Sequence, residues 1–77
     1  MRESVATHYD RPLFAFRVEQ ARRRRGLTRK ELAELAGYSA PAWLYRIETL
    51  AYGTRLRYRE ALAEALGVSR AWLEGRE

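Results

Sequence analysis

Residues 26–37 read GLTRKELAELAG, a stretch that decides the fold because it contains a short helix together with its own start and stop signals. Thr28 and Glu31 have the spacing of a capping box, in which each side chain satisfies a free backbone N–H at the helix start. Gly37 tolerates the left-handed conformation with which many helices end. The stretch therefore predicts a helix over residues 29–36, with an apolar stripe formed by Leu32, Ala33 and Leu35.

Upstream of this stretch the sequence predicts one longer helix preceded by an arm. Asp10 is a candidate cap, Pro12 is tolerated in a first helical turn, and apolar residues then recur at helical spacing up to Gly26. We expect a helix over residues 11–25. Residues 1–10 are expected to form a flexible arm.

Three further helices are expected downstream. Ser39 is predicted to cap a helix over residues 40–49, Thr54 to cap the helix after it, and Ser69 to cap a last short helix. The connections between all five helices are short, which is typical of a compact helical bundle. The fold class is therefore predicted to be all-α, with one domain over residues 11–77.

The charge of the chain favours a polyanionic partner. The net charge is +5 at pH 7 and the sequence pI is about 10.2, and such a positive field attracts nucleic acid. Lys30 is the one lysine, and the other cations are arginines, whose planar donor fork suits phosphates and guanine edges. A solvated basic face would produce the same composition, so both interpretations stay open at this point.

Several classes of function receive no support from the residues present. The 77-residue chain has no cysteine, which excludes disulfides, thiolate metal sites and cysteine nucleophiles. His8 is isolated, and no nucleophile and base are spaced for catalysis, so we expect no enzyme activity, no catalytic residue, no metal and no cofactor. No apolar run is long enough for a membrane span, and the amino terminus does not resemble a secretory signal, so we expect a cytoplasmic protein without a membrane partner.

The motifs also occur in a recognisable order. The stretch that opens at residue 26 is followed by Ile47-Glu48, then by Ala65-Leu66-Gly67-Val68-Ser69, and then by Trp72-Leu73. Over about residues 13–75 this combination resembles the phage repressor and Cro (cI) family of helix-turn-helix DNA-binding domains. The resemblance implies a compact five-helix bundle of the lambda-repressor-like type.

The resemblance implies three sets of site residues. The base-reading positions of the recognition helix fall on Pro41, Ala42, Tyr45 and Arg46, among which Arg46 is the best guanine reader. The phosphate-binding positions fall on Thr28, Arg29, Arg55 and Arg57. A structural salt bridge is implied between Arg22 and Glu48.

Two functions follow as alternatives. In the first, the chain is a transcriptional regulator, expected to be a repressor, whose homodimer places two recognition helices in successive major grooves of double-stranded DNA. Possible subunit contacts are Leu50, Tyr52 and Trp72. In the second, the same fold docks a protein partner, as an antitoxin or a polymerase-binding factor would, because residues 40–43 lack the amides and cations that usually read base edges.

Overall fold

The computed structural model describes residues 9–77, and the described residues form helices joined by short loops. The helices are α2 (Arg11–Arg24), α3 (Arg29–Leu35), α4 (Pro41–Leu50), α5 (Leu56–Leu66) and α6 (Arg70–Leu73). The predicted all-α fold with five helices is confirmed for this part of the chain. Residues 1–8, which include most of the predicted arm and His8, lie outside the described residues. None of the helices in residues 9–77 is both long and apolar enough to cross a membrane.

Side-chain caps begin three of the helices as the sequence predicts. Asp10 accepts a hydrogen bond from a backbone N–H in the first turn of α2, and Ser69 does the same for α6. The capping box is complete, since the Thr28 N–H donates to Glu31 Oε1 over 2.8 Å and the Glu31 N–H donates to Thr28 Oγ1 over 3.0 Å. These local bonds fix where α3 begins, and α3 and α4 are the two helices that the resemblance assigns to the helix-turn-helix motif.

The predicted cap of α4 is wrong by one residue. Ala40 occupies the cap position in place of Ser39, and no side chain caps the helix. Pro41 explains the difference, because its fixed φ starts the helix and its missing N–H removes one of the donors that a cap would satisfy. The helix accordingly begins and ends one residue later than predicted, at Pro41 and Leu50.

The predicted cap of α5 is also wrong. Arg55 occupies the cap position, again without a side-chain hydrogen bond, and Thr54 is buried in the loop before it. The Thr54 hydroxyl donates to the Tyr52 carbonyl over 3.3 Å, and the Thr54 N–H donates to the Tyr9 hydroxyl over 2.8 Å. Thr54 therefore orders the loop and connects it to the residues before α2.

The core is one apolar cluster to which all five helices contribute. Its most buried members include Phe14, Val18, Leu32, Leu44, Ile47, Leu62, Leu66 and Leu73. Leu35 does not belong to the core, contrary to the predicted stripe of α3, because 60% of its surface is exposed. Leu35 and Ala33 lie about 200° apart around the helix axis, so a helix that buries Ala33 turns Leu35 toward solvent.

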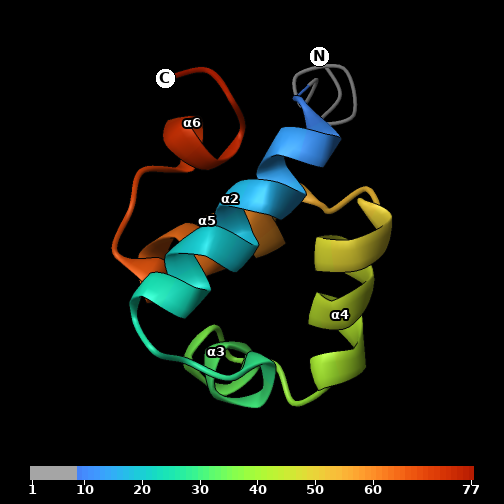
Figure 1. Ribbon diagram of the computed structural model, residues 1–77, viewed down its shortest axis with the longest axis vertical. Helices are drawn as coiled ribbons and strands as arrows, with labels where there is room; N and C mark the ends of the chain where they lie inside the picture. Colours follow the sequence, from blue (N-terminus) through green and yellow to red (C-terminus); the bar gives the residue numbers. More distant parts are fainter. Residues whose placement is uncertain (1–8) are drawn as a thin grey trace.

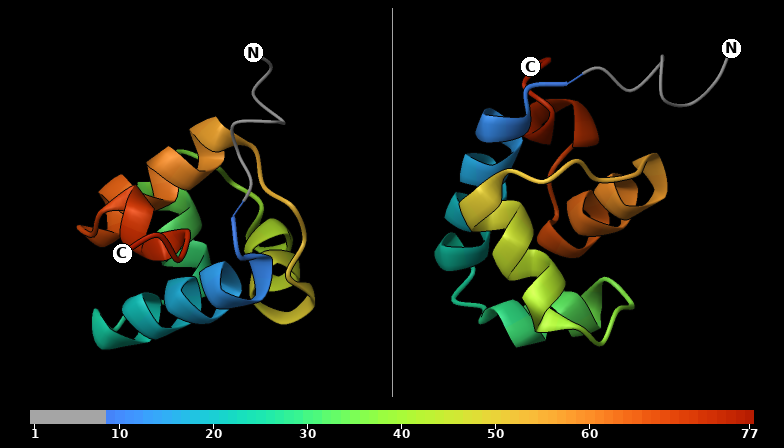
Figure 2. Two further views of the ribbon diagram at one scale, coloured as in Figure 1. Left: turned by 90° about the horizontal axis from the view of Figure 1, so that it is seen from above. Right: turned by 90° about the vertical axis from the view of Figure 1, so that its right-hand side faces the viewer.

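In the view of Figure 1 α2 crosses the front of the bundle, and Figure 2 shows that it lies along one side of the molecule. This helix packs against α4, α5 and α6, and α3 packs against α4 and α5. Figure 2 shows from two further directions that α4 lies along one side of the bundle, with α3 at one of its ends. The second helix of the motif is thus supported along one face and open along the other.

A buried ion pair joins α5 to the end of α6. Arg59 Nε lies 2.6 Å from Glu74 Oε2, and both side chains are almost fully buried. The Arg59 guanidinium also donates to the Thr54 carbonyl and lies 4.3 Å from the ring centroid of Tyr9. Burial acts to raise the pKa of Glu74, but the hydrogen bonds and charges of Arg59 and Arg76 outweigh it and hold that pKa below its ordinary value.

Candidate nucleic-acid interface

The turn between α3 and α4 depends on a glycine. Gly37 has a φ of +90°, a conformation that strains any residue with a Cβ, and its N–H donates to the Glu34 carbonyl over 3.0 Å. The Tyr38 N–H donates to the Ala33 carbonyl over 2.7 Å, so the end of α3 is closed by hydrogen bonds within the turn. The turn leads directly into α4, and the two helices pack against each other.

The two faces of α4 differ sharply in burial. Leu44, Ile47 and Glu48 face the core. The four predicted base-reading residues all lie on the exposed side, namely Pro41, Ala42, Tyr45 and Arg46. Because positions four apart are neighbours on a helix, these residues form one continuous surface, which we call the reading face.

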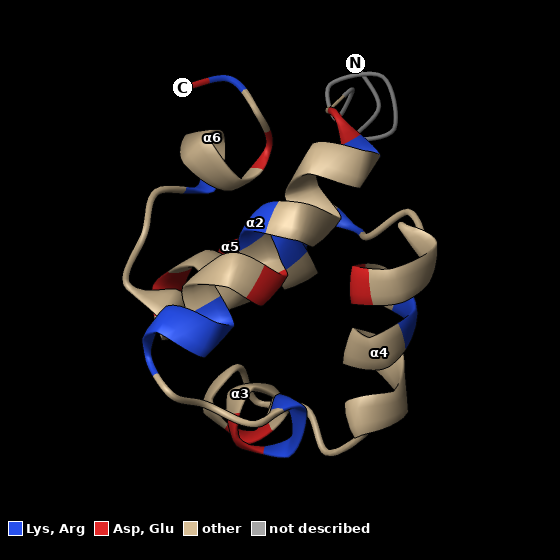
Figure 3. Cartoon of the chain, in the orientation of Figure 1, with Lys and Arg blue, Asp and Glu red and all other residues tan. Residues whose placement is uncertain are grey.

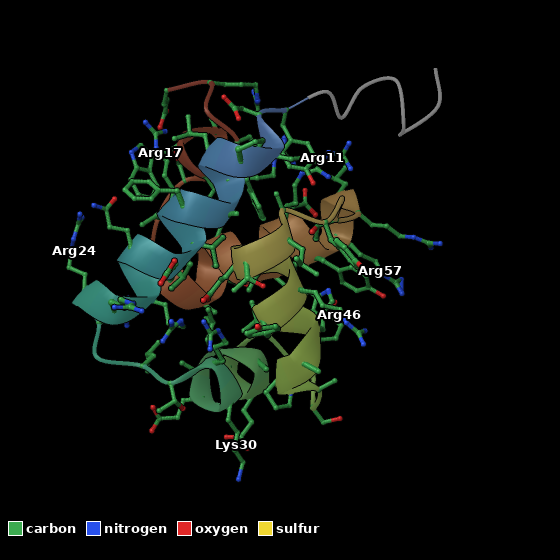
Figure 4. The ribbon with its side chains drawn as sticks, turned by 45° about the vertical axis from the view of Figure 1, so that its right-hand side comes forward. Arg11, Arg17, Arg24, Lys30, Arg46 and Arg57 are labelled. Atoms are coloured by element: carbon green, nitrogen blue, oxygen red, sulfur yellow. The ribbon has the colours of Figure 1, made fainter. Side chains whose placement is uncertain are left out.

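The chemistry of the reading face is mostly apolar. Pro41 and Ala42 offer only carbon atoms, and Tyr45, with 52% of its surface exposed, offers an aromatic ring and a hydroxyl. Arg46 supplies the charge of this face and points away from the bundle (Figure 4). Figure 3 shows that the basic and acidic segments of α4 lie on different sides of the helix. The face can therefore make one strong charged contact amid several apolar ones.

A buried carboxylate holds α4 against the two preceding helices. Arg22 donates to both oxygens of Glu48, with Nε 2.8 Å from Oε2 and Nη2 3.2 Å from Oε1. The Glu48 side chain has no exposed surface. We call the ion pair of Arg22 and Glu48 the brace. Arg22 also donates to the Leu27 carbonyl over 2.8 Å, which connects the brace to the loop before α3. The implied ion pair between Arg22 and Glu48 is thus present.

Arg29 has a second role that the sequence does not predict. Its Nε lies 2.9 Å from Glu48 Oε1, so it shares the buried carboxylate with Arg22. Its guanidinium carbon lies 5.2 Å from the ring centroid of Tyr45, within the range of a cation–π contact. Arg29 therefore connects the brace to the reading face. No local motif indicates this, because the partners are 16 and 19 residues away along the chain.

The other predicted phosphate contacts flank the reading face. Thr28 is exposed at the start of α3, where its hydroxyl accepts the Glu31 N–H. Arg55 and Arg57 are exposed at the start of α5. In Figure 4, Arg46 and Arg57 project on the same side of the molecule, whereas Arg24 projects on the opposite side.

An aromatic cluster supports the start of α4 and the start of α5. Tyr38, Trp43 and Tyr58 contact one another, with ring centroids 4.8–5.5 Å apart. The guanidinium of Arg57 lies 5.6 Å from the Tyr58 ring. Trp43 is half-buried and packs against the core. The cluster therefore packs the start of α5 against the start of α4.

The three predicted subunit contacts differ in exposure. Leu50 and Tyr52 have 56% and 53% of their surface exposed, at and just after the end of α4. Trp72 is half-buried, and the Arg17 guanidinium lies 4.8 Å from its ring. Leu50 and Tyr52 thus remain the residues of this set that a partner could reach most easily.

Within residues 9–77 there is no group of three or more His, Cys, Asp or Glu side chains that could hold a metal ion.

Comparison with known protein families identifies the domain. A family model described as a helix-turn-helix domain matches residues 13–74, which is most of the chain and includes all of α3, α4 and α5. A search of curated proteins found no match.

Proposed function

Because the chain belongs to the helix-turn-helix domain family, we propose that it is a sequence-specific regulator of transcription that binds double-stranded DNA. We further propose that the domain is of the phage repressor and Cro type and that the protein acts as a repressor. The reading face carries this proposal, since α4 is buried on one side and presents a continuous exposed surface on the other. The major groove of B-form DNA is wide enough to admit a helix of this kind.

The roles of individual residues follow from their chemistry. Arg46 would read a guanine, because its fork can donate to O6 and N7 together. Arg55 and Arg57 would hold phosphates beside the groove, since such contacts fix orientation without carrying sequence information. The brace formed by Arg22 and Glu48 would keep α4 at a constant angle to the rest of the bundle.

A homodimer remains part of the proposal. One helix-turn-helix of this size makes few contacts, and two copies spaced by about 34 Å would reach successive major grooves on one side of the duplex. Leu50 and Tyr52 are the proposed subunit contacts because they are exposed and apolar. We also propose that the protein acts in the cytoplasm and has no enzyme activity.

A salt series tests the proposed function. Labelled random duplex is titrated with the full chain at several salt concentrations, and the slope of log affinity against log salt is measured. Binding that weakens steeply with salt is expected, because phosphate contacts by arginine release counterions. An absence of binding at low salt contradicts the proposal and favours the alternative, a protein-interaction module that docks a partner through the apolar face of Pro41, Ala42, Trp43 and Tyr45.

A further inference from the structure

Four side chains form a continuous series from the core to the reading face. Arg22 and Arg29 both bond to the buried carboxylate of Glu48, and the Arg29 guanidinium lies against the ring of Tyr45. The Arg29 side chain is 32% exposed and the Glu48 side chain is fully buried, so Arg29 is held at its inner end by a fixed partner. Tyr45 thus lies against a guanidinium that cannot move freely.

This contact limits the conformations of an otherwise exposed aromatic ring. A free tyrosine on a helix surface loses rotamer entropy when it binds a partner, and a ring already held against a fixed group loses less. The guanidinium lies on one side of the ring, and about half of the residue remains exposed. Tyr45 is therefore preorganised to present apolar surface to whatever lies against the reading face.

We propose that Tyr45 is a specificity-determining residue that recognises the 5-methyl group of a thymine, and that Arg29 is the residue that positions it. This inference rests on the proposed function, because it requires α4 to lie in the major groove. In that groove thymine alone among the four bases presents a methyl group, and apolar side chains contact it. Ala42, three residues before Tyr45 on the same face, extends the apolar surface.

The test removes the methyl group from the DNA and leaves the base pair intact. A preferred site is selected from a random duplex pool with the full wild-type chain, and each thymine in the site is then replaced in turn by deoxyuridine. We expect one position in each half-site at which this replacement weakens binding about fourfold, the value that corresponds to one buried methylene-sized group. The opposite base is not changed, so the hydrogen bonds of the base pair and the charge of the duplex stay constant.

Variants of Tyr45 assign the methyl contact to the ring. Tyr45→Ala is expected to bind the thymine and deoxyuridine sites equally, whereas Tyr45→Phe is expected to retain the fourfold difference because the ring remains. If the difference persists in Tyr45→Ala, another residue reads the methyl group and the inference is wrong. If Tyr45→Phe loses the difference, the hydroxyl and not the ring makes the contact, which also overturns it.

A variant of Arg29 tests the positioning role. Arg29→Gln keeps a hydrogen-bond donor for phosphate but loses the charge that faces Glu48 and the ring. It is expected to reduce the thymine preference to less than twofold, and Arg24→Gln, on an exposed arginine far from α4, is expected to leave it unchanged. An unchanged preference in Arg29→Gln rejects the positioning role, since loss of a phosphate contact or of stability alone would weaken both sites equally.

The outcomes separate this inference from the function on which it rests. Binding of duplex DNA with no thymine position sensitive to deoxyuridine overturns the inference and leaves the proposed function intact. Failure to bind any duplex at low salt overturns both.

Discussion

Replacing Arg22 by alanine removes one member of a buried ion pair and leaves the other member in place. Glu48 has no exposed side-chain surface, and it would keep only the single bond from Arg29 Nε. Breaking a buried pair in this way costs about 3–5 kcal/mol, because an uncompensated charge remains in the core. Since Arg29 still neutralises part of that charge, we expect a loss near the lower end, about 3 kcal/mol.

This loss is large for a chain of this length. A domain of 77 residues has a total stability of about 4–12 kcal/mol, so the variant should remain folded only under mild conditions. Thermal and urea unfolding, followed by circular dichroism, measure the change. For a domain of this size, about 3 kcal/mol corresponds to a fall in melting temperature of about 12–24 °C.

Two further variants sharpen the measurement. Arg24→Ala is the matched control, because Arg24 is an exposed arginine near the end of the same helix. Arg29→Ala should cost about 1.5 kcal/mol, since Arg22 keeps both of its bonds to Glu48. Equal unfolding midpoints for Arg22→Ala and Arg24→Ala would refute the reasoning that the pair acts as a brace.

Three other changes have defined outcomes. Ala51 has a φ of +53°, which costs a residue with a Cβ about 1–2 kcal/mol, so Ala51→Gly should stabilise the fold by about 0.5–1 kcal/mol after the entropy of glycine in the unfolded chain is subtracted. A melting temperature no higher than that of the wild type would contradict this. The pKa of Glu74 is lowered in the fold, so its carboxylate contributes stability above its unfolded-state pKa, and this contribution is lost as the pH falls through the folded value. As the pH falls from about 5 to about 2, the free energy of unfolding of Glu74→Gln, measured with urea, should therefore decrease by less than that of the wild type. Equal decreases in the two proteins would show that Glu74 does not contribute to the pH dependence of stability. Arg57→Ala should weaken binding to all duplexes alike and reduce the salt slope by about one, whereas a change at one base pair only would show that Arg57 reads sequence.

Local signals predicted the helices well because they act within a few residues. The capping box of Thr28 and Glu31 and the positive φ of Gly37 depend only on neighbouring backbone atoms, and both occur as the sequence indicates. The caps at Ser39 and Thr54 were wrong because proline starts α4 without a cap and because the Thr54 side chain bonds within its own loop. A serine or threonine near a helix start does not cap the helix when another residue starts it or when the side chain makes a different hydrogen bond.

Two buried or half-buried contacts that sequence reasoning missed join residues that are distant along the chain. Arg59 pairs with Glu74, which lies 15 residues away along the chain, and neither residue belongs to a sequence motif that indicates the other. The position of Arg29 between Glu48 and Tyr45 depends on how α3 packs against α4, which local spacing does not specify. The exposed face of α4, by contrast, was predictable, because the helical period separates its residues from the buried ones.

The central claim is that α4 reads base pairs through its exposed face, and Arg46 tests it most directly. The affinities of the wild type, Arg46→Ala and the control Arg24→Ala are measured on a selected site, on each of its single-base-pair variants and on random duplex. Arg46→Ala is expected to lose about 1–3 kcal/mol of discrimination at one guanine position in each half-site, with a much smaller loss on random duplex, while Arg24→Ala keeps the wild-type pattern. Mismatch penalties that are the same in Arg46→Ala and in the wild type would contradict the claim.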